Sequence, residues 1–148
     1  AALLQGVRLA RWRGGPTWRE PLLAVLHIGY AFVPVGLAAL VLSALGLLAT
    51  VAALHLLTVG GIGLMTMAVM TRASRGHTGR ALSASAITTA AYALLLTATL
   101  LRPVADLFPD FYQLALGCSG LCWILAYVLF VAEYAPILLT PSLKAMRR

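Results

Sequence analysis

The sequence predicts an all-α membrane protein, a polytopic bundle of four transmembrane helices. The chain is 61% hydrophobic and only 10% charged, whereas soluble domains contain about 25% charged residues. Four apolar runs are each long enough to cross the ~30 Å hydrocarbon core of a bilayer as a helix. The charged residues lie almost entirely in the gaps between these runs. Lipid is therefore the expected solvent for most of the chain.

The first predicted span covers residues 21–46 and carries no formal charge. It follows a basic segment, residues 1–20, in which tryptophans stand beside arginines, a combination that suits the headgroup level of a membrane. Pro21 stands at a favourable first-turn position. Pro34 is expected to kink the helix, which neighbouring helices can accommodate.

The second predicted span covers residues 49–71 and contains three glycines, Gly60, Gly61 and Gly63. In a membrane, such glycines let another helix, or a flat cofactor, approach the backbone closely. A polar, basic loop is predicted to follow at residues 72–80.

Two more spans complete the predicted bundle. The third covers residues 81–101, and its many small side chains suit tight helix packing. Pro103 and Pro109 argue against a continuous helix in the next polar gap, residues 102–113. The fourth span covers residues 114–138.

The positions of the basic residues predict the orientation of the bundle. They concentrate in the N-terminal segment, in the loop after the second span and in the C-terminal tail, whereas the remaining polar gap carries Arg102 against Asp106 and Asp110. Four alternating spans put the three basic segments on one face, so both termini are predicted to be cytoplasmic. The chain thus divides into a cytoplasmic or interfacial segment, a transmembrane domain and a cytoplasmic tail: residues 1–20, 21–138 and 139–148.

The same pattern disfavours two other classes of protein. A net charge of +7 and a pI near 10.3 would suggest nucleic acid in a soluble protein, but here the charges mark topology, and no nucleic-acid partner is expected. A soluble four-helix bundle would need a polar stripe along each helix. None of the four apolar runs has such a stripe.

Polar groups inside the spans are candidates for function because their burial in lipid costs free energy. His27 and His55 are candidate metal ligands; alternatively, each imidazole simply hydrogen-bonds across helices. His27 should lie ~9 Å from the cytoplasmic end and His55 ~9 Å from the outer end. The two therefore differ in depth by more than ~10 Å and cannot be the two axial ligands of one haem. Glu133, at the depth of His27, could orient a metal-bound imidazole, or it is a partly solvated interfacial carboxylate.

The loop after the second span groups three guanidinium groups and an imidazole, those of Arg72, Arg75, Arg80 and His77. These groups could bind haem propionates or another anion through charge-assisted hydrogen bonds. The alternative is a topology signal whose side chains contact lipid headgroups.

Cys118 and Cys122 are four residues apart and lie on one face of the fourth span. Together with the methionine sulfurs of the second span they could suggest Cu(I). The alternative is that cysteine and methionine act as ordinary packing residues. No catalytic triad, phosphate-binding glycine loop or carboxylate pair is present, so no catalytic residue is predicted.

Three stretches resemble the NnrS family: residues 55–80, HLLTVGGIGLMTMAVMTRASRGHTGR; residues 21–30, PLLAVLHIGY; and residues 134–138, YAPIL. The first stretch is highly specific, and the resemblance runs in the right order over most of the chain. It implies a polytopic bacterial membrane protein that contains haem and copper. It also implies a role in nitric oxide metabolism or in resistance to nitrosative stress, often beside denitrification.

The resemblance further implies a location, partners and site residues. The expected location is the bacterial inner membrane. The expected partners are the lipid bilayer, nitric oxide or iron–nitrosyl species, and the preceding helices of full-length members, whose C-terminal third this chain resembles. His27, His55 and His77 fall on histidine positions of the family pattern. The tail, TPSLK, departs from that pattern. The alternative function is a non-metal membrane module, such as part of a transporter or an assembly scaffold.

Overall fold

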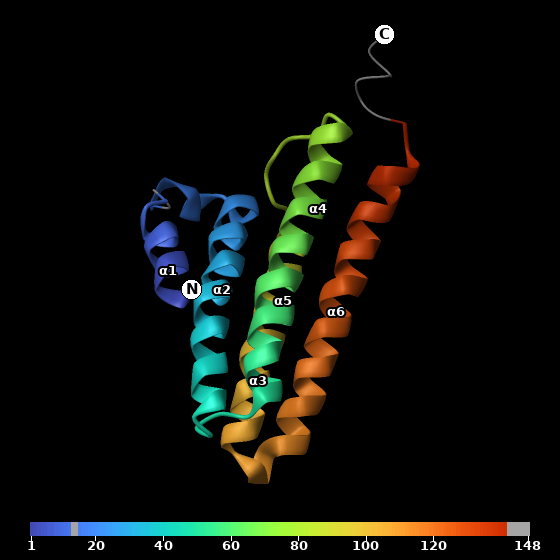
Figure 1. The fold of residues 1–148 in the computed structure, drawn as a ribbon. Coiled ribbons are helices and arrows are strands. Elements are labelled where there is room, and N and C mark those ends of the chain that lie inside the picture. Colours follow the sequence, from blue (N-terminus) through green and yellow to red (C-terminus); the bar gives the residue numbers. More distant parts are fainter. Residues whose placement is uncertain (13–14, 142–148) are drawn as a thin grey trace.

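The computed structural model of the chain describes residues 1–12 and 15–141. In these residues the regular structure is helical, and four helical runs are long and apolar enough to cross a membrane (Figure 1). Their bounds are Pro21–Ala44, Thr50–His77, Ala86–Leu107 and Pro109–Leu139. The predicted fold class, an all-α bundle of four candidate membrane spans, is therefore confirmed.

Helix α2, Pro21–Ala44, is the first span. The Glu20 side chain caps it by accepting a hydrogen bond from the backbone nitrogen of Leu22 at 3.2 Å. Pro21, the first residue of the helix, needs no hydrogen-bond acceptor because proline has no backbone N–H group. The helix ends two residues before the predicted end, where Gly46 takes a positive φ of 74°, a conformation that glycine adopts without strain.

The second span is one continuous run made of helix α3, Thr50–His55, the π-helical segment η2, Leu56–Gly63, and helix α4, Leu64–His77. It extends past the predicted end at residue 71, so most of the expected 72–80 loop is helical. Hydropathy marks where the apolar surface ends, whereas the backbone hydrogen bonds continue until Gly79, which has a φ of 74°, turns the chain.

The third span, helix α5, covers Ala86–Leu107 and is shifted toward the C-terminus relative to the predicted 81–101. Ser85 sets its start by accepting a hydrogen bond from the backbone nitrogen of Thr88 at 3.0 Å. The helix continues through Pro103, which corrects the expectation that this proline interrupts it. A proline removes one backbone hydrogen bond, and a helix packed along its length tolerates that loss.

The chain reverses at the short 3-10 segment η3, Pro109–Phe111, so the second proline of the gap does mark a turn. Helix α6, Tyr112–Leu139, follows and is the longest helix among the described residues. It packs against α5 in an antiparallel hairpin (Figure 1).

The N-terminal segment contains helix α1, Ala2–Ala10, and the 3-10 segment η1, Gly15–Arg19. Helix α1 folds back beside α2 (Figure 1). The Tyr30 hydroxyl of α2 donates a hydrogen bond to the Gln5 side-chain oxygen of α1. This part of the predicted interfacial segment therefore lies along the first span.

Gly60 lies where three helical elements meet. A Cβ atom added to it would lie 2.6 Å from Cγ of Phe32 in α2 and 2.7 Å from Cγ2 of Thr99 in α5. This contact confirms that a glycine of the second span allows a close helix approach. Large apolar side chains are exposed on the outside of each span, including Val41, Ile62, Leu100 and Val131. Such a surface suits lipid rather than water.

The start of α2, the loop between α4 and α5 and the end of α6 meet at one end of the bundle. Glu20, next to the N-terminal segment, accepts a hydrogen bond from the backbone nitrogen of Ala84 at 2.8 Å. Arg80, in the loop between α4 and α5, donates to the Thr140 hydroxyl at 3.3 Å. The basic residues of the C-terminal tail lie outside the described residues, and the cytoplasmic orientation of the termini stays a prediction.

Candidate functional site

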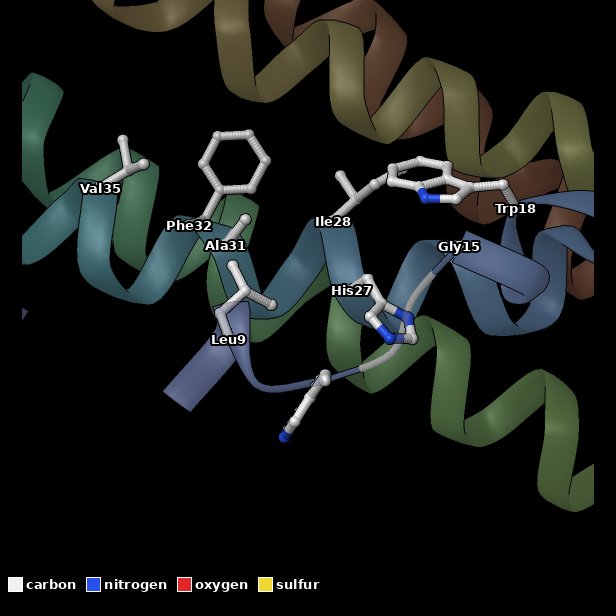
Figure 2. Close-up of a pocket in the computed structure, with 9 residues that line it drawn as sticks. Leu9, Gly15, Trp18, His27, Ile28, Ala31, Phe32 and Val35 are labelled. Atoms are coloured by element: carbon white, nitrogen blue, oxygen red, sulfur yellow. The ribbon is translucent and has the colours of Figure 1, made fainter. Parts of the chain in front are cut away.

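His27 lies in a groove between α1, η1 and one face of α2 (Figure 2). The groove has a volume of about 480 Å³, which is in the ~300–1,000 Å³ range of small-molecule pockets. Its other lining residues are apolar or aromatic: Leu9, Trp12, Gly15, Trp18, Ile28, Ala31, Phe32 and Val35. A single imidazole therefore stands in an otherwise apolar recess that opens on the bundle surface.

The His27 ring is fixed by its own helix and by a tryptophan. Its Nδ1 atom lies 3.0 Å from the carbonyl oxygen of Leu23. Because a carbonyl only accepts hydrogen bonds, Nδ1 carries the proton, and Nε2 of the neutral ring carries the lone pair. The Trp12 ring stands edge-on to the imidazole at a centroid distance of 5.5 Å and an interplanar angle of 87°. Within the described residues, Nε2 has no hydrogen-bond partner.

A second depression adjoins the groove and shares Trp12 with it. Arg8 and Arg11, both exposed, line this depression. The guanidinium carbon of Arg8 lies 6.0 Å from the centroid of the Tyr30 ring. The sequence indicated these arginines only as a topology signal, because their position next to the His27 groove depends on the fold-back of α1.

His55 belongs to a different cavity, of about 270 Å³, between the second span, α5 and α6. Its Nδ1 atom donates to the carbonyl oxygen of Val51 at 2.8 Å, and its Nε2 atom accepts a hydrogen bond from Nε of Arg102 at 3.3 Å. The cavity shares no lining residue with the His27 groove. The two histidines thus line separate recesses, and their difference in depth stays a prediction.

The basic residues around the end of α4 go to different partners. Arg72 and His77 are exposed, Arg75 pairs with Glu133 through a contact of 2.6 Å, and Arg80 contacts the end of α6. None of the four lines the His27 groove.

A hydrogen-bonded polar cluster joins α4, α5 and α6. One carboxylate oxygen of Glu133 accepts from Arg75, and the other accepts from the hydroxyls of Ser85 at 2.8 Å and Thr88 at 2.7 Å. Nε of Arg75 also donates to the Tyr134 hydroxyl at 3.1 Å. Glu133 is therefore occupied by Arg75, and the contact with His27 that similar depths suggested is not formed. The sequence did contain a signal for this ion pair, because the basic Arg75 and the acidic Glu133 lie near the same end of the second and fourth spans.

Metal-ligating side chains are dispersed in the part of the chain that the structure describes, where no group of three His, Cys, Asp or Glu residues could hold a metal ion. Cys118 is exposed and Cys122 is half-buried, and both are free thiols.

Comparison with known proteins identifies the family. The model of a family described as NnrS protein matches residues 1–142. Comparisons with curated proteins and with solved structures gave no match. Because the family match covers nearly the whole chain and agrees with four candidate membrane spans, this membrane protein belongs to the NnrS family.

Proposed function

We propose that this chain binds haem in the His27 groove and takes part in nitric oxide metabolism or in resistance to nitrosative stress. The observation that carries the proposal is the state of His27: its Nδ1–H group is held by the Leu23 carbonyl, which directs the lone pair to Nε2. Imidazole oriented by a hydrogen bond at the other ring nitrogen is the usual form of a histidine metal ligand.

The lining of the groove suits a flat apolar macrocycle. A single proximal imidazole is sufficient for haem ligation, so the absence of a second nearby ligand among the described residues does not conflict with haem. Trp12 and Trp18 flank the recess, where they would cover the macrocycle and limit the access of water. Arg8 and Arg11 in the adjoining depression would bind the propionates through charge-assisted hydrogen bonds. The arginines predicted from the sequence, Arg72, Arg75 and Arg80, remain an alternative propionate site.

Copper fits the described residues less well than haem does. A protein copper site needs several nitrogen or sulfur ligands, and the described residues contain no cluster of three. His55 remains a predicted metal ligand, but a metal ion at its Nε2 atom would have to replace the hydrogen bond from Arg102. His77 is exposed, and it would bind a metal ion only together with ligands from outside the described residues. Further copper ligands would come from preceding helices of a full-length protein.

The chemistry follows from this arrangement. Haem bound here would supply an iron centre able to coordinate nitric oxide. His27 would be the iron ligand, and the Leu23 carbonyl would keep the imidazole in the required tautomer. The apolar walls would favour a small uncharged ligand over water.

Haem content and optical spectra of the full-length parent protein test the proposal. We expect a Soret band that responds to nitric oxide, and we expect His27→Ala to lower the haem content strongly while membrane insertion is retained. His77→Ala is the matched control, because that histidine is exposed outside the groove. Unchanged haem content and spectra in His27→Ala would refute this site. A parent protein that contains no haem would favour the non-metal membrane module instead.

A further inference from the structure

We propose that the cavity beside His55 binds a small oxyanion through the guanidinium group of Arg102. The Nη1 atom of Arg102 is buried and has no hydrogen-bond partner in the described part of the chain. A buried donor left unpaired costs free energy. Arg102 also lines the cavity of about 270 Å³, so its guanidinium group borders an open recess that a ligand can enter.

The charge of Arg102 also lacks a counter-ion. Among the described residues, Arg75 and Glu133 form an ion pair, and Arg102 forms none. Asp106 lies one turn further along α5, but it lines a different cavity, against the turn between α2 and α3. No carboxylate lines the cavity beside His55. An unpaired cation within a membrane span is costly, and a bound anion would offset that cost.

His55 holds the guanidinium in a binding orientation. The Val51 carbonyl fixes the imidazole through Nδ1, and Nε2 then accepts the Nε–H group of Arg102. This contact occupies one edge of the guanidinium and leaves its terminal amino groups for a ligand. Guanidinium groups present parallel N–H donors that match the paired oxygens of carboxylates and similar oxyanions.

The remaining lining residues suit a small oxyanion group. The Ser119 hydroxyl donates to the Ala98 carbonyl at 2.8 Å, so its proton is already used. The Trp123 indole N–H group has no hydrogen-bond acceptor among the described residues and can be the second donor. The volume of about 270 Å³ is just below the ~300–1,000 Å³ range of small-molecule pockets. It therefore favours an ion of a few heavy atoms over an organic cofactor.

The same chemistry is available from two sources, a free oxyanion and the phosphate of a lipid headgroup. Arg102 lies five residues before the end of α5, near the level that headgroups reach. The proposal is independent of haem binding at His27, because the two recesses share no lining residue.

Binding of ¹³C-formate to the delipidated full-length protein tests the proposal by NMR line broadening, with gluconate at equal ionic strength as the size control. We expect saturable broadening by the parent, and its loss in Arg102→Gln. Arg19→Gln makes the same change in net charge at an exposed arginine of η1 and should bind as the parent does. If Arg102→Gln does not fold, Arg102→Lys can replace it in the test. Lysine keeps the positive charge but lacks the paired N–H donors of the guanidinium group, so formate binding should weaken about tenfold.

Phosphorus analysis before delipidation distinguishes the two sources. A lipid occupant would give more tightly bound phosphate in the parent than in the Arg102 variant, and formate binding would appear only after the lipid is removed. A free oxyanion would give equal phosphate in both proteins and direct formate binding. Equal formate broadening in the parent and the Arg102 variants would overturn the proposal. So would the absence of both formate binding and Arg102-dependent phosphate.

Discussion

Arg75 of α4 and Glu133 of α6 form an ion pair, with 2.6 Å between Nη2 and Oε1, in which each side chain is only 12% exposed. The hydroxyls of Ser85 and Thr88 bond the second carboxylate oxygen, so the pair also joins α5. Removing one partner of a buried ion pair leaves an uncompensated charge and costs about 3–5 kcal/mol. We therefore expect Arg75→Gln to lower the free energy of unfolding by about 3 kcal/mol, measured by denaturation in detergent.

The matched control for this prediction is Arg72→Gln, because Arg72 lies on the same helix but is exposed. It should change stability by less than about 0.5 kcal/mol. The double variant Arg75→Gln with Glu133→Gln should lose less than the sum of the two single losses. Additive losses would mean that the two side chains act independently and that the pair is not a stabilising link between α4 and α6.

Alanine substitutions at two adjacent glycines of η2 should have different effects on the stability of the bundle. A Cβ atom at Gly60 would lie 2.6 Å from Phe32 and 2.7 Å from Thr99, so Gly60→Ala should destabilise the bundle by about 1–3 kcal/mol through overpacking. At Gly61 the nearest atom outside the helix backbone, Cγ2 of Val33, would be 3.8 Å away, an ordinary contact. Gly61→Ala should therefore be neutral or slightly stabilising. Thermal unfolding of the two variants checks this, and equal losses would contradict the close three-helix contact.

The number and type of spans could be predicted from the sequence, but some of their ends could not. Apolar runs locate the lipid-facing surface, whereas helices end where backbone hydrogen bonding ends. The second span was expected to stop at residue 71, which placed Arg75 in a loop. In the structure α4 continues to His77, and this extra length brings Arg75 against α6 and Glu133. The ion pair was missed for that reason.

The candidate site was predictable to a similar extent. The separation of His27 from His55 followed from helix length and depth alone. The surroundings of His27 did not, because Trp12 contacts its ring, and Arg8 and Arg11 line the adjoining depression, only through the fold-back of α1. Local sequence does not determine that fold-back. The partner of His55, Arg102, lies on α5 and required the relative positions of two spans.

Cysteine labelling should reveal the orientation of the bundle. The C-terminal end of α4, which contains Gly76, and the three residues before α6 lie at opposite ends of the bundle (Figure 1). In a background with Cys118→Ser and Cys122→Ser, Gly76→Cys should react only from the cytoplasmic side and Asp110→Cys only from the outside, as the distribution of basic residues predicts. A Cβ atom at Gly76 meets nothing closer than 3.8 Å. Labelling of both positions from one side would contradict the four-span arrangement.

The last prediction concerns the arginines that hold haem propionates, and it depends on haem binding at His27. Arg8 and Arg11 line the depression that shares Trp12 with the His27 groove, whereas Arg72 and Arg80 line neither recess. Losing two charge-assisted hydrogen bonds to an anionic group should weaken haem retention by about tenfold or more. We therefore expect Arg8→Gln with Arg11→Gln to lose haem on gel filtration, and Arg72→Gln with Arg80→Gln to retain it. Both double variants remove the same charge, so a general electrostatic effect would lower haem content equally in the two. Loss of haem in the second variant alone would assign the propionates to the basic residues around the end of α4, as the sequence suggested. Full haem content in both would mean that His27 and the tryptophans hold the macrocycle without help from either pair.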